Sequence, residues 1–262
     1  MTLASLDAQA RAAGVEVVVV SDGAGTPTAA IAHQHRARLV ALGERAGANA
    51  ARNAGTAAST GELLIFIDDD VEAPRGWLQA VLDGARDAPG HDVFGGPIRA
   101  RLEGGGPRTC GRESAPITTL DLGESDRDVE LVWSANMAVR RGALERIGPF
   151  DETLLGCGEE EDWLRRYRTA GGRVRYLAAA GVDHRRTHAD ATVRALARAA
   201  YRRGIAARGY DARKGTAPSA ACELRTLAGC AWHTVRRRCT NGVVLGAHSA
   251  GRLREALARL RP

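Results

Sequence analysis

The sequence predicts an α/β fold in which a mostly parallel sheet is covered by helices. Short apolar runs alternate with segments of helical periodicity through residues 1–184, the order expected when helices connect the strands of one sheet. The run from Leu63 to Ile67 is apolar at every position, which is typical of a strand buried on both faces. With 262 residues, the chain is long enough to bury a substantial core.

The individual elements follow from periodicity and from Gly and Pro boundaries. Helices are expected over 3–13, 26–34, 47–61, 77–86, 140–147 and 159–170, and strands over 17–20, 38–42, 63–67, 93–94, 174–177 and 182–184. Residues 129–139 are predicted to form one strand with a polar interruption, and 102–128 a loop suited to be a lid. From residue 192 onward helical periods continue, with breaks expected at Gly204, Gly209, Gly215 and Pro218.

Charge is distributed unevenly along the chain. The net charge is +6, but residues 185–262 contain 17 basic and 4 acidic residues, which leaves −7 for residues 1–184. Such a basic segment is typical either of contact with anionic lipid, nucleic acid or a phosphorylated substrate, or of a solvated helical face. We favour the solvated face for most of it. Nucleic acid ranks last because only Tyr201, Tyr210 and Trp232 offer rings for base stacking.

Cysteine usage and hydropathy indicate the cellular compartment of the protein. The five cysteines are odd in number and have neither metal-type pairing nor disulfide-framework spacing, so we expect reduced thiols. No stretch of the sequence approaches 18 successive apolar residues, and the first residues lack a basic patch followed by an apolar core. We therefore expect a cytoplasmic protein whose basic helices are candidates for peripheral contact with the inner face of a membrane.

Three successive carboxylates, Asp68, Asp69 and Asp70, follow the strand at 63–67. Adjacent carboxylates repel one another unless a cation lies among them, and Mg²⁺ and Mn²⁺ prefer such oxygens. Ligands of open α/β sheets bind beyond the carboxyl ends of strands. The stretch is therefore a candidate metal and phosphate site, or alternatively an acidic helix N-terminus ahead of Pro74. Both interpretations stay open on these residues alone.

A second acidic cluster opens the helix predicted at 159–170 and consists of Glu159, Glu160, Glu161 and Asp162. Acids in the first turn of a helix stabilise it by a few tenths of a kcal/mol each, which is one explanation of the cluster. However, four carboxylates exceed what capping requires. A carboxylate held near others keeps its proton more readily and can serve as a general base.

Taken together, these motifs resemble the family 2 glycosyltransferases of the GT-A fold. The resemblance rests on their order along the chain: DDD at 68–70, GGP at 95–97, WSANMAVRR at 133–141, GPFDE at 148–152, GEEEDWLRRYRTAG at 158–171 and VDH at 182–184. It covers residues 15–184. The resemblance implies a Rossmann-like GT-A domain over 1–184, followed by a basic α-helical extension over 185–262.

The resemblance also implies roles for single residues. Asp70 matches the direct ligand of a Mn²⁺ or Mg²⁺ ion, with Asp68 and Asp69 beside it at the donor site. Asp68 matches the residue nearer the ribose or sugar and is a second metal candidate. His184 matches a position that completes the metal shell in some members, the alternative being a partly buried histidine without such a role.

Further positions match the donor pocket and the catalytic base. Asp22 matches an acid that contacts the nucleotide base, Arg52 and Asn53 match helix residues beneath it, and Asn136 matches the segment that lines the donor sugar and acceptor. The family's usual catalytic pair is Glu-Asp, whereas this chain has Glu-Glu at 159–160. The base is therefore either Glu160 or Asp162.

The chain also departs from the family at its start. Family members begin with a central strand that grips the nucleotide, and this sequence begins at the helix that follows it. Without that strand, each buried backbone group that it would pair costs about 1–3 kcal/mol. We therefore expect an N-terminally truncated domain and a start codon farther upstream.

The activity that the resemblance implies is inverting, metal-dependent transfer of a sugar. The donor is a nucleotide-diphosphate sugar, and the acceptor hydroxyl belongs to a glycan, a lipid-linked molecule or a small molecule, as in synthesis of cell-envelope polysaccharides. One alternative is a catalytically inactive module that binds nucleotide sugars. Another is a nucleotidyltransferase, which would need a basic Gly-rich phosphate loop, but residues 21–25 contain no Lys or Arg.

Overall fold

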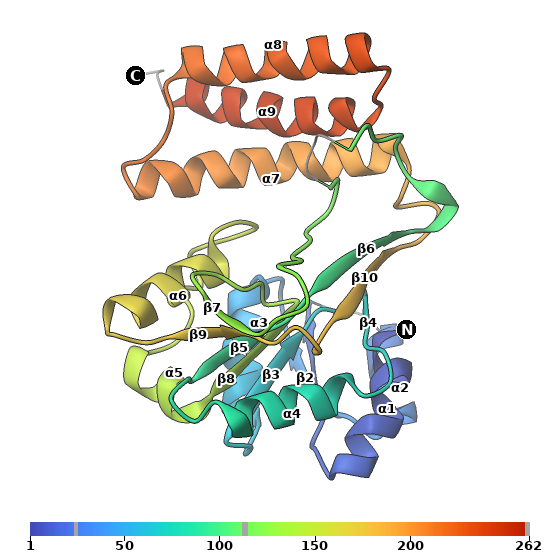
Figure 1. Ribbon diagram of the computed structural model, residues 1–262, viewed down its shortest axis with the longest axis vertical. Coiled ribbons are helices and arrows are strands. Elements are labelled where there is room, and N and C mark those ends of the chain that lie inside the picture. The colour runs from blue at the N-terminus through green and yellow to red at the C-terminus, as the bar shows by residue number, and fades with distance from the viewer. Residues whose placement is uncertain (24–25, 112–114, 260–262) are drawn as a thin grey trace. The chain divides into compact units, whose positions relative to one another are not determined.

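The computed structural model describes residues 1–23, 26–111 and 115–259 (Figure 1). Ala24 and Gly25 of the turn predicted at 21–25, and residues 112–114 of the predicted lid, lie outside the described residues. The chain divides into two compact units. The first unit consists of Met1–Arg99, Thr119–Leu155 and Glu159–His184, and the helical unit of Ala100–Thr118, Gly156–Gly158 and Arg185–Pro262.

The first unit contains six helices and most of the strands among the residues described. Its helices are α1 (Thr2–Ala13), α2 (Thr26–Gln34), α3 (Ala48–Ala58), α4 (Trp77–Asp87), α5 (Arg141–Ile147) and α6 (Glu159–Thr169). Its strands are β1 (Val18–Asp22), β2 (Arg38–Leu42), β3 (Leu63–Ile67), β4 (Val71–Glu72), β5 (Val93–Gly95), β7 (Arg127–Val129), β8 (Asn136–Arg140) and β9 (Val174–Tyr176). Two more strands, β6 (Ile98–Leu102) and β10 (Val182–Arg186), begin in this unit.

The main sheet confirms the α/β class and corrects the expected strand directions. Its order is β3-β8-β5-β9-β7, and only the β5–β9 pair is parallel. The sheet is therefore mixed, and the expectation of a mostly parallel sheet is wrong for it. The alternation of strands and helices is interrupted between β5 and β8, where the described residues form no α-helix, so no parallel crossover is implied there. A separate pair, β1 and β2, is parallel.

The strand predicted over 129–139 is two strands that occupy different places in the sheet. β7 pairs with β9 at an edge, whereas β8 lies between β3 and β5. The intervening residues 130–135 are irregular, although Val132 is fully buried. A buried apolar loop residue resembles a strand residue in sequence, which explains the error.

Alternating residues of β3 face two different groups of helices. Leu63, Ile65 and Ile67 pack into the cluster that contains Trp77 of α4, while Leu64 and Phe66 pack into the cluster that contains Trp163 of α6. This is the two-residue period of a strand covered on both faces. On the α6 side, aromatic rings follow one another in contact, with centroids 5.6 Å apart for Phe66–Phe150 and 5.5 Å for Phe150–Trp163.

The helical unit is built on α7 (Val193–Arg213), α8 (Ala220–Arg237) and α9 (Asn241–Ala258), with a 3₁₀ turn at Glu103–Gly105. α7 packs directly on α9: a Cβ atom on Gly204 would overlap the carbonyl of His248, and one on Gly251 the carbonyl of Tyr201. Breaks expected at Gly204 and Gly209 are therefore wrong, because α7 continues through both. Glycine here permits close helix packing instead of ending the helix.

One half-buried guanidinium links the three helices. Arg252 Nη2 of α9 lies 2.9 Å from Asp211 Oδ2 of α7 and 2.8 Å from Glu223 Oε1 of α8. The Glu223 side chain is only 4% exposed, so its charge depends on this partner. None of the helices in the part of the chain described here is long and apolar enough to cross a membrane.

A methyl group added at a glycine should destabilise the protein where the glycine lies in the contact between α7 and α9, and should not where it lies outside that contact. Gly251→Ala should lower the free energy of unfolding by about 2–3 kcal/mol, because the new Cβ meets backbone that cannot turn aside. Thermal unfolding followed by circular dichroism measures this. Gly229→Ala is the matched control, since nothing lies within 4 Å of its Cβ position on α8 and alanine favours the helix. Equal stability of the two variants would contradict the close packing.

Candidate functional site

The acidic triplet lies where β3 ends and the chain turns into β4. Asp69 is exposed, whereas Asp68 and Asp70 are half-buried. The hydroxyl of Thr2, in α1, is 2.6 Å from the carbonyl oxygen of Asp69 and 2.5 Å from that of Val71. The first helix therefore holds the backbone of the triplet in place.

β10 brings His184 next to the triplet. His184 is paired with Val71 in the antiparallel β10–β4 ladder and is only 4% exposed. Its Nε2 lies 3.3 Å from Asp70 Oδ1. The structure thus unites Asp70 and His184, two predicted ligands separated by more than a hundred residues.

Several charged groups act on Asp68 at this edge of the sheet. Burial raises the pKa of Asp68 to about 6; Arg52 opposes this rise, Asp70 and Glu160 add to it, and His184 opposes it. Carboxylates that raise one another's pKa in this way are stabilised by a divalent cation. Carboxylate oxygens are the ligands that Mn²⁺ and Mg²⁺ prefer, and Asp70 lies in contact with the His184 imidazole.

A polar relay connects α3 to α6 beside the triplet. Arg52 Nη2 donates to Ser134 Oγ at 2.6 Å, and Ser134 donates to Glu160 Oε1 from its backbone N and its hydroxyl, both at 3.2 Å. These bonds orient the carboxylate of Glu160. Sequence reasoning singled out Arg52 and Glu160 but missed Ser134. The signal was available, since Ser134 is a polar residue inside the otherwise apolar motif 131–135.

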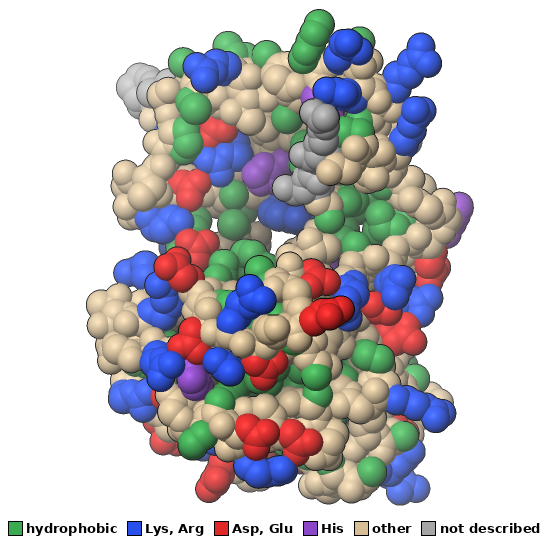
Figure 2. All heavy atoms as spheres, in the orientation of Figure 1, with side chains coloured by type: hydrophobic (Ala, Val, Ile, Leu, Met, Phe, Trp, Pro, Cys, Tyr) green, Lys and Arg blue, Asp and Glu red, His purple; other side chains and the backbone are tan. Residues whose placement is uncertain are grey.

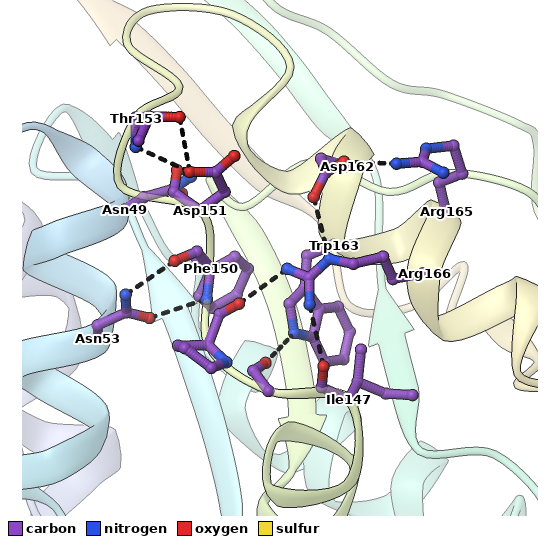
Figure 3. Close-up of polar contacts among 12 residues, drawn as sticks. Asn49, Asn53, Ile147, Phe150, Asp151, Thr153, Asp162, Trp163, Arg165 and Arg166 are labelled. Atoms are coloured by element: carbon purple, nitrogen blue, oxygen red, sulfur yellow. Dashed lines mark hydrogen bonds and ion pairs between the residues drawn. The ribbon is translucent and has the colours of Figure 1, made fainter. Parts of the chain in front are cut away.

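Asp162 is bonded to arginines of its own helix (Figure 3). Its two oxygens accept hydrogen bonds from Arg165 Nη2 at 2.7 Å and Arg166 Nε at 3.0 Å. Arg166 also donates to the carbonyls of Ile147 at 3.0 Å and Pro149 at 2.8 Å. Asp162 therefore fixes an arginine that attaches α6 to the turn at 147–150.

Asn53, in α3, is hydrogen-bonded to the same turn. Its side-chain amide donates to Phe150 O at 3.0 Å, and its Oδ1 accepts from Phe150 N at 3.0 Å (Figure 3). Its Nδ2 also lies 2.8 Å from Glu152 Oε1. A second amide, that of Asn49, donates to Asp151 O at 2.7 Å. α3 is thereby bound to the 150–152 segment by side-chain amides.

Asn136 and Asp22 also make structural contacts. Asn136 is 2% exposed; its Nδ2 donates to Ala180 O at 2.7 Å and Pro97 O at 3.2 Å, and its Oδ1 accepts from Trp77 Nε1 at 3.1 Å. Asp22 accepts from the backbone N of Ala46 at 2.6 Å and of Gly47 at 3.0 Å, just before α3 begins. Asn136 is thus buried, whereas Asp22 is exposed and lines a cavity.

Some of these residues border a large cavity within the first unit. It has a volume of about 1250 Å³, and Asp22, Arg52, Asp68, Asp70 and Ser134 are among its lining residues. Its apolar walls come from β1 and β3, which belong to different sheets and do not pair with each other. Small-molecule pockets usually enclose about 300–1,000 Å³, so the cavity can admit a ligand as large as a nucleotide sugar.

The sequence of the chain matches the model of a known protein family. The model of Glycosyl transferase family 2 matches residues 1–148, more than half of the chain. The chain belongs to this family. That assignment confirms the resemblance drawn from the motifs and sets aside a nucleotidyltransferase.

Relatives of the chain carry glycosyltransferase names. The pre-mycofactocin glycosyltransferase of Mycobacterium tuberculosis is 33% identical over 183 residues, which is 66% of this chain and 38% of the relative. Glycosyltransferase AglE of Haloferax volcanii is 29% identical over 164 residues, 60% of this chain and 52% of the relative. The chain thus spans between about a third and a half of the length of these relatives.

The fold is also found among solved glycosyltransferase structures. The crystal structure of GalNAc-T7 with UDP, GalNAc and Mn²⁺ aligns with a TM-score of 0.50 and 15% identity, covering 71% of this chain and 41% of that one. At this identity the likeness supports the GT-A fold alone.

Proposed function

We propose that the chain transfers a sugar, with inversion, from a nucleotide-diphosphate sugar to an acceptor hydroxyl, and that the transfer depends on a divalent cation. The observation that carries the proposal is that Asp68, Asp70 and Arg52 line one cavity, while Ser134, also in its lining, binds Glu160, and His184 Nε2 lies 3.3 Å from Asp70 Oδ1. Membership of the family supports the reaction class. The Mn²⁺ named with GalNAc-T7 makes manganese the first cation to test.

We assign the acidic triplet and His184 to the part of the site that binds the diphosphate of the donor. Asp68, Asp70 and His184 would hold the cation, which supplies positive charge against the negative charge that develops on the leaving diphosphate. Arg52 lines the same cavity and adds a fixed positive charge near it. Asp22 and Asp69 are exposed beside the cavity and are assigned to contacts with the nucleotide.

Glu160 is assigned as the general base. Its Oε1 is held by two hydrogen bonds from Ser134, and the second oxygen takes the proton of the acceptor hydroxyl. The hydroxyl oxygen forms a bond to the anomeric carbon as the bond from that carbon to the phosphate oxygen breaks. The bonding pair leaves with the nucleoside diphosphate. Attack from the side opposite the leaving group inverts the configuration.

Asp162, Asn53 and Asn136 are assigned to positioning. Both oxygens of Asp162 are occupied by arginines of its own helix, which favours Glu160 over Asp162 as the base. The amides of Asn53 and Asn136 are likewise bonded to backbone atoms of the protein. These residues act through the segments that they hold.

Calorimetric titration with a panel of nucleoside diphosphates tests the metal assignment. We expect one nucleotide to bind with Mn²⁺ present and to lose at least tenfold in affinity on chelation, because its phosphates then face unneutralised carboxylates. Asp70→Asn should remove the metal dependence and the turnover. Asp87→Asn, an exposed change on α4 away from the cavity lining, is the control. Full activity of Asp70→Asn would refute the assignment, and donor binding without turnover by the unaltered chain would identify an inactive binding module.

Two variants of α6 separate the base from its neighbour. Glu160→Gln should lower kcat by about 10²–10⁴ while leaving nucleotide affinity unchanged, because a base acts only in the chemical step. Asp162→Asn should instead lower the free energy of unfolding by about 1–2 kcal/mol, because it weakens the bonds to Arg165 and Arg166. Rate, affinity and thermal stability are measured for both, with Glu161→Gln as the control from the same turn. A larger rate loss in Asp162→Asn would assign the base to Asp162.

The exposed face of α8 supports contact with a membrane that carries a lipid-linked acceptor. Leu224, Trp232 and Val235 are 56%, 69% and 76% exposed and follow one another at helical spacing. Hydrophobic and basic side chains lie side by side over α8 in Figure 2. The acidic residue of α8, Glu223, is buried against Arg252, so the outer face is apolar and basic.

Flotation with liposomes tests this contact. The chain should float with anionic vesicles at low salt and much less with zwitterionic vesicles, because arginines are attracted to anionic headgroups. Trp232→Ala should reduce the bound fraction severalfold, whereas Leu257→Ala, a half-exposed change on α9, should not. Absence of binding to anionic vesicles would remove the membrane from the proposal.

A further inference from the structure

A second cluster of metal-ligating side chains lies in the helical unit. Cys110 belongs to the loop 106–111, His233 to the last turns of α8, and Cys239 to the link between α8 and α9. Their ligand atoms, two Sγ and one ring nitrogen, all lie within 4.8 Å of one another. The distance from Cys110 Sγ to His233 Nε2 is 3.5 Å. These residues play no part in the glycosyl-transfer site.

The end of α8 places Cys239 beside His233. Arg238 adopts the left-handed conformation, with φ 49°, and the backbone N of Cys239 donates to Thr234 O at 3.2 Å. This bond turns the chain back under the last turn of α8. Left-handed backbone costs about 1–2 kcal/mol for a residue other than glycine, so the turn is held by surrounding contacts. Cys239 is fully buried as a result.

Backbone contacts deliver Cys110 to the same point. Arg108 N donates to Thr240 Oγ1 at 2.7 Å, and Arg108 O accepts from Asn241 N at 3.1 Å. The thiol of Cys239 also lies 3.4 Å from Arg108 O. The loop is therefore attached to the α8–α9 link two residues before Cys110. The cluster joins segments that are 123 residues apart in sequence.

The chemistry and spacing of the cluster suit zinc. Two cysteine sulfurs and an imidazole are soft and borderline ligands, which Zn²⁺ prefers and Mg²⁺ or Mn²⁺ does not. Tetrahedral zinc with ordinary Zn–S and Zn–N bonds places a sulfur and a nitrogen about 3.6 Å apart. The observed separation of 3.5 Å between Cys110 Sγ and His233 Nε2 agrees with that geometry. The negative end of the α8 dipole lies at this terminus and also favours a cation.

We propose that Cys110, His233 and Cys239 bind a thiophilic divalent cation, with Zn²⁺ as the preferred ion and water as the fourth ligand. The ion ties the loop 106–111 to the link between α8 and α9. Binding requires that both thiols release their protons, so two thiolates balance the charge of the cation. The proposal is independent of the assigned glycosyl transfer, whose cation site is built from carboxylates and prefers a different metal.

Cobalt substitution tests the proposal on the whole chain. The purified protein is reduced, freed of metal with a chelator and titrated with Co²⁺. We expect an intense near-ultraviolet thiolate-to-cobalt charge-transfer band that saturates at about one equivalent, and displacement of the band by Zn²⁺. Carboxylate-bound cobalt gives no such band, so the acidic triplet does not contribute to the readout.

Substitutions of Cys110, which is exposed, and of His233, which is half-buried, complete the test without changing a buried side chain. Cys110→Ser and His233→Ala should each remove the band and weaken zinc binding at least tenfold, as measured by competition with a chromophoric chelator. Cys222→Ser is the matched control, since Cys222 is an exposed cysteine of α8 outside the cluster. A band of normal intensity in Cys110→Ser would overturn the proposal. So would a Cys110–Cys239 disulfide found by non-reducing peptide mapping of the freshly purified chain.

Discussion

Mutual repulsion among carboxylates is the constraint on which the first unit depends. Asp68, Asp70 and Glu160 lie close enough to raise the pKa of Asp68, and they are brought there by three elements that meet at one end of the sheet. Interactions with Arg52 and His184 oppose this rise in the pKa of Asp68. The hydrogen bonds of Ser134, Asn53 and Asp162 hold the elements that surround these charged groups.

Local features of the fold and site followed from the sequence. The strand before the triplet was predictable because burial on both faces leaves a continuous apolar run, and the structure places Leu63–Ile67 in that role. The helix α6 was predictable from its acids and its closing glycines. The ion pairs of Asp162 were not predicted, although Arg165 and Arg166 follow it by three and four residues, the spacing at which such pairs form on a helix.

Features that depend on contacts between residues far apart in the sequence could not be predicted. The direction of β8 depends on its ladders with β3 and β5, and no residue within β8 records them. Gly204 was interpreted as a helix break because its partner surface on α9 lies some fifty residues away. The cysteine cluster escaped notice for the same reason, since spacing rules detect ligands that are close in sequence. Ser134 is a different case: it was visible, but nothing local linked it to both Arg52 and Glu160.

The cavity between β1 and β3 has a consequence for how the chain behaves in solution. In the part of the chain that is described, β1 pairs only with β2, and β3 only with β8, so each strand turns one edge toward the cavity. Open strand edges are templates for adding a strand, and here two such edges share one apolar space. A strand from a neighbouring molecule that entered there would find hydrogen-bonding partners on both sides. Self-association of concentrated protein is therefore expected to compete with any small molecule that occupies the cavity.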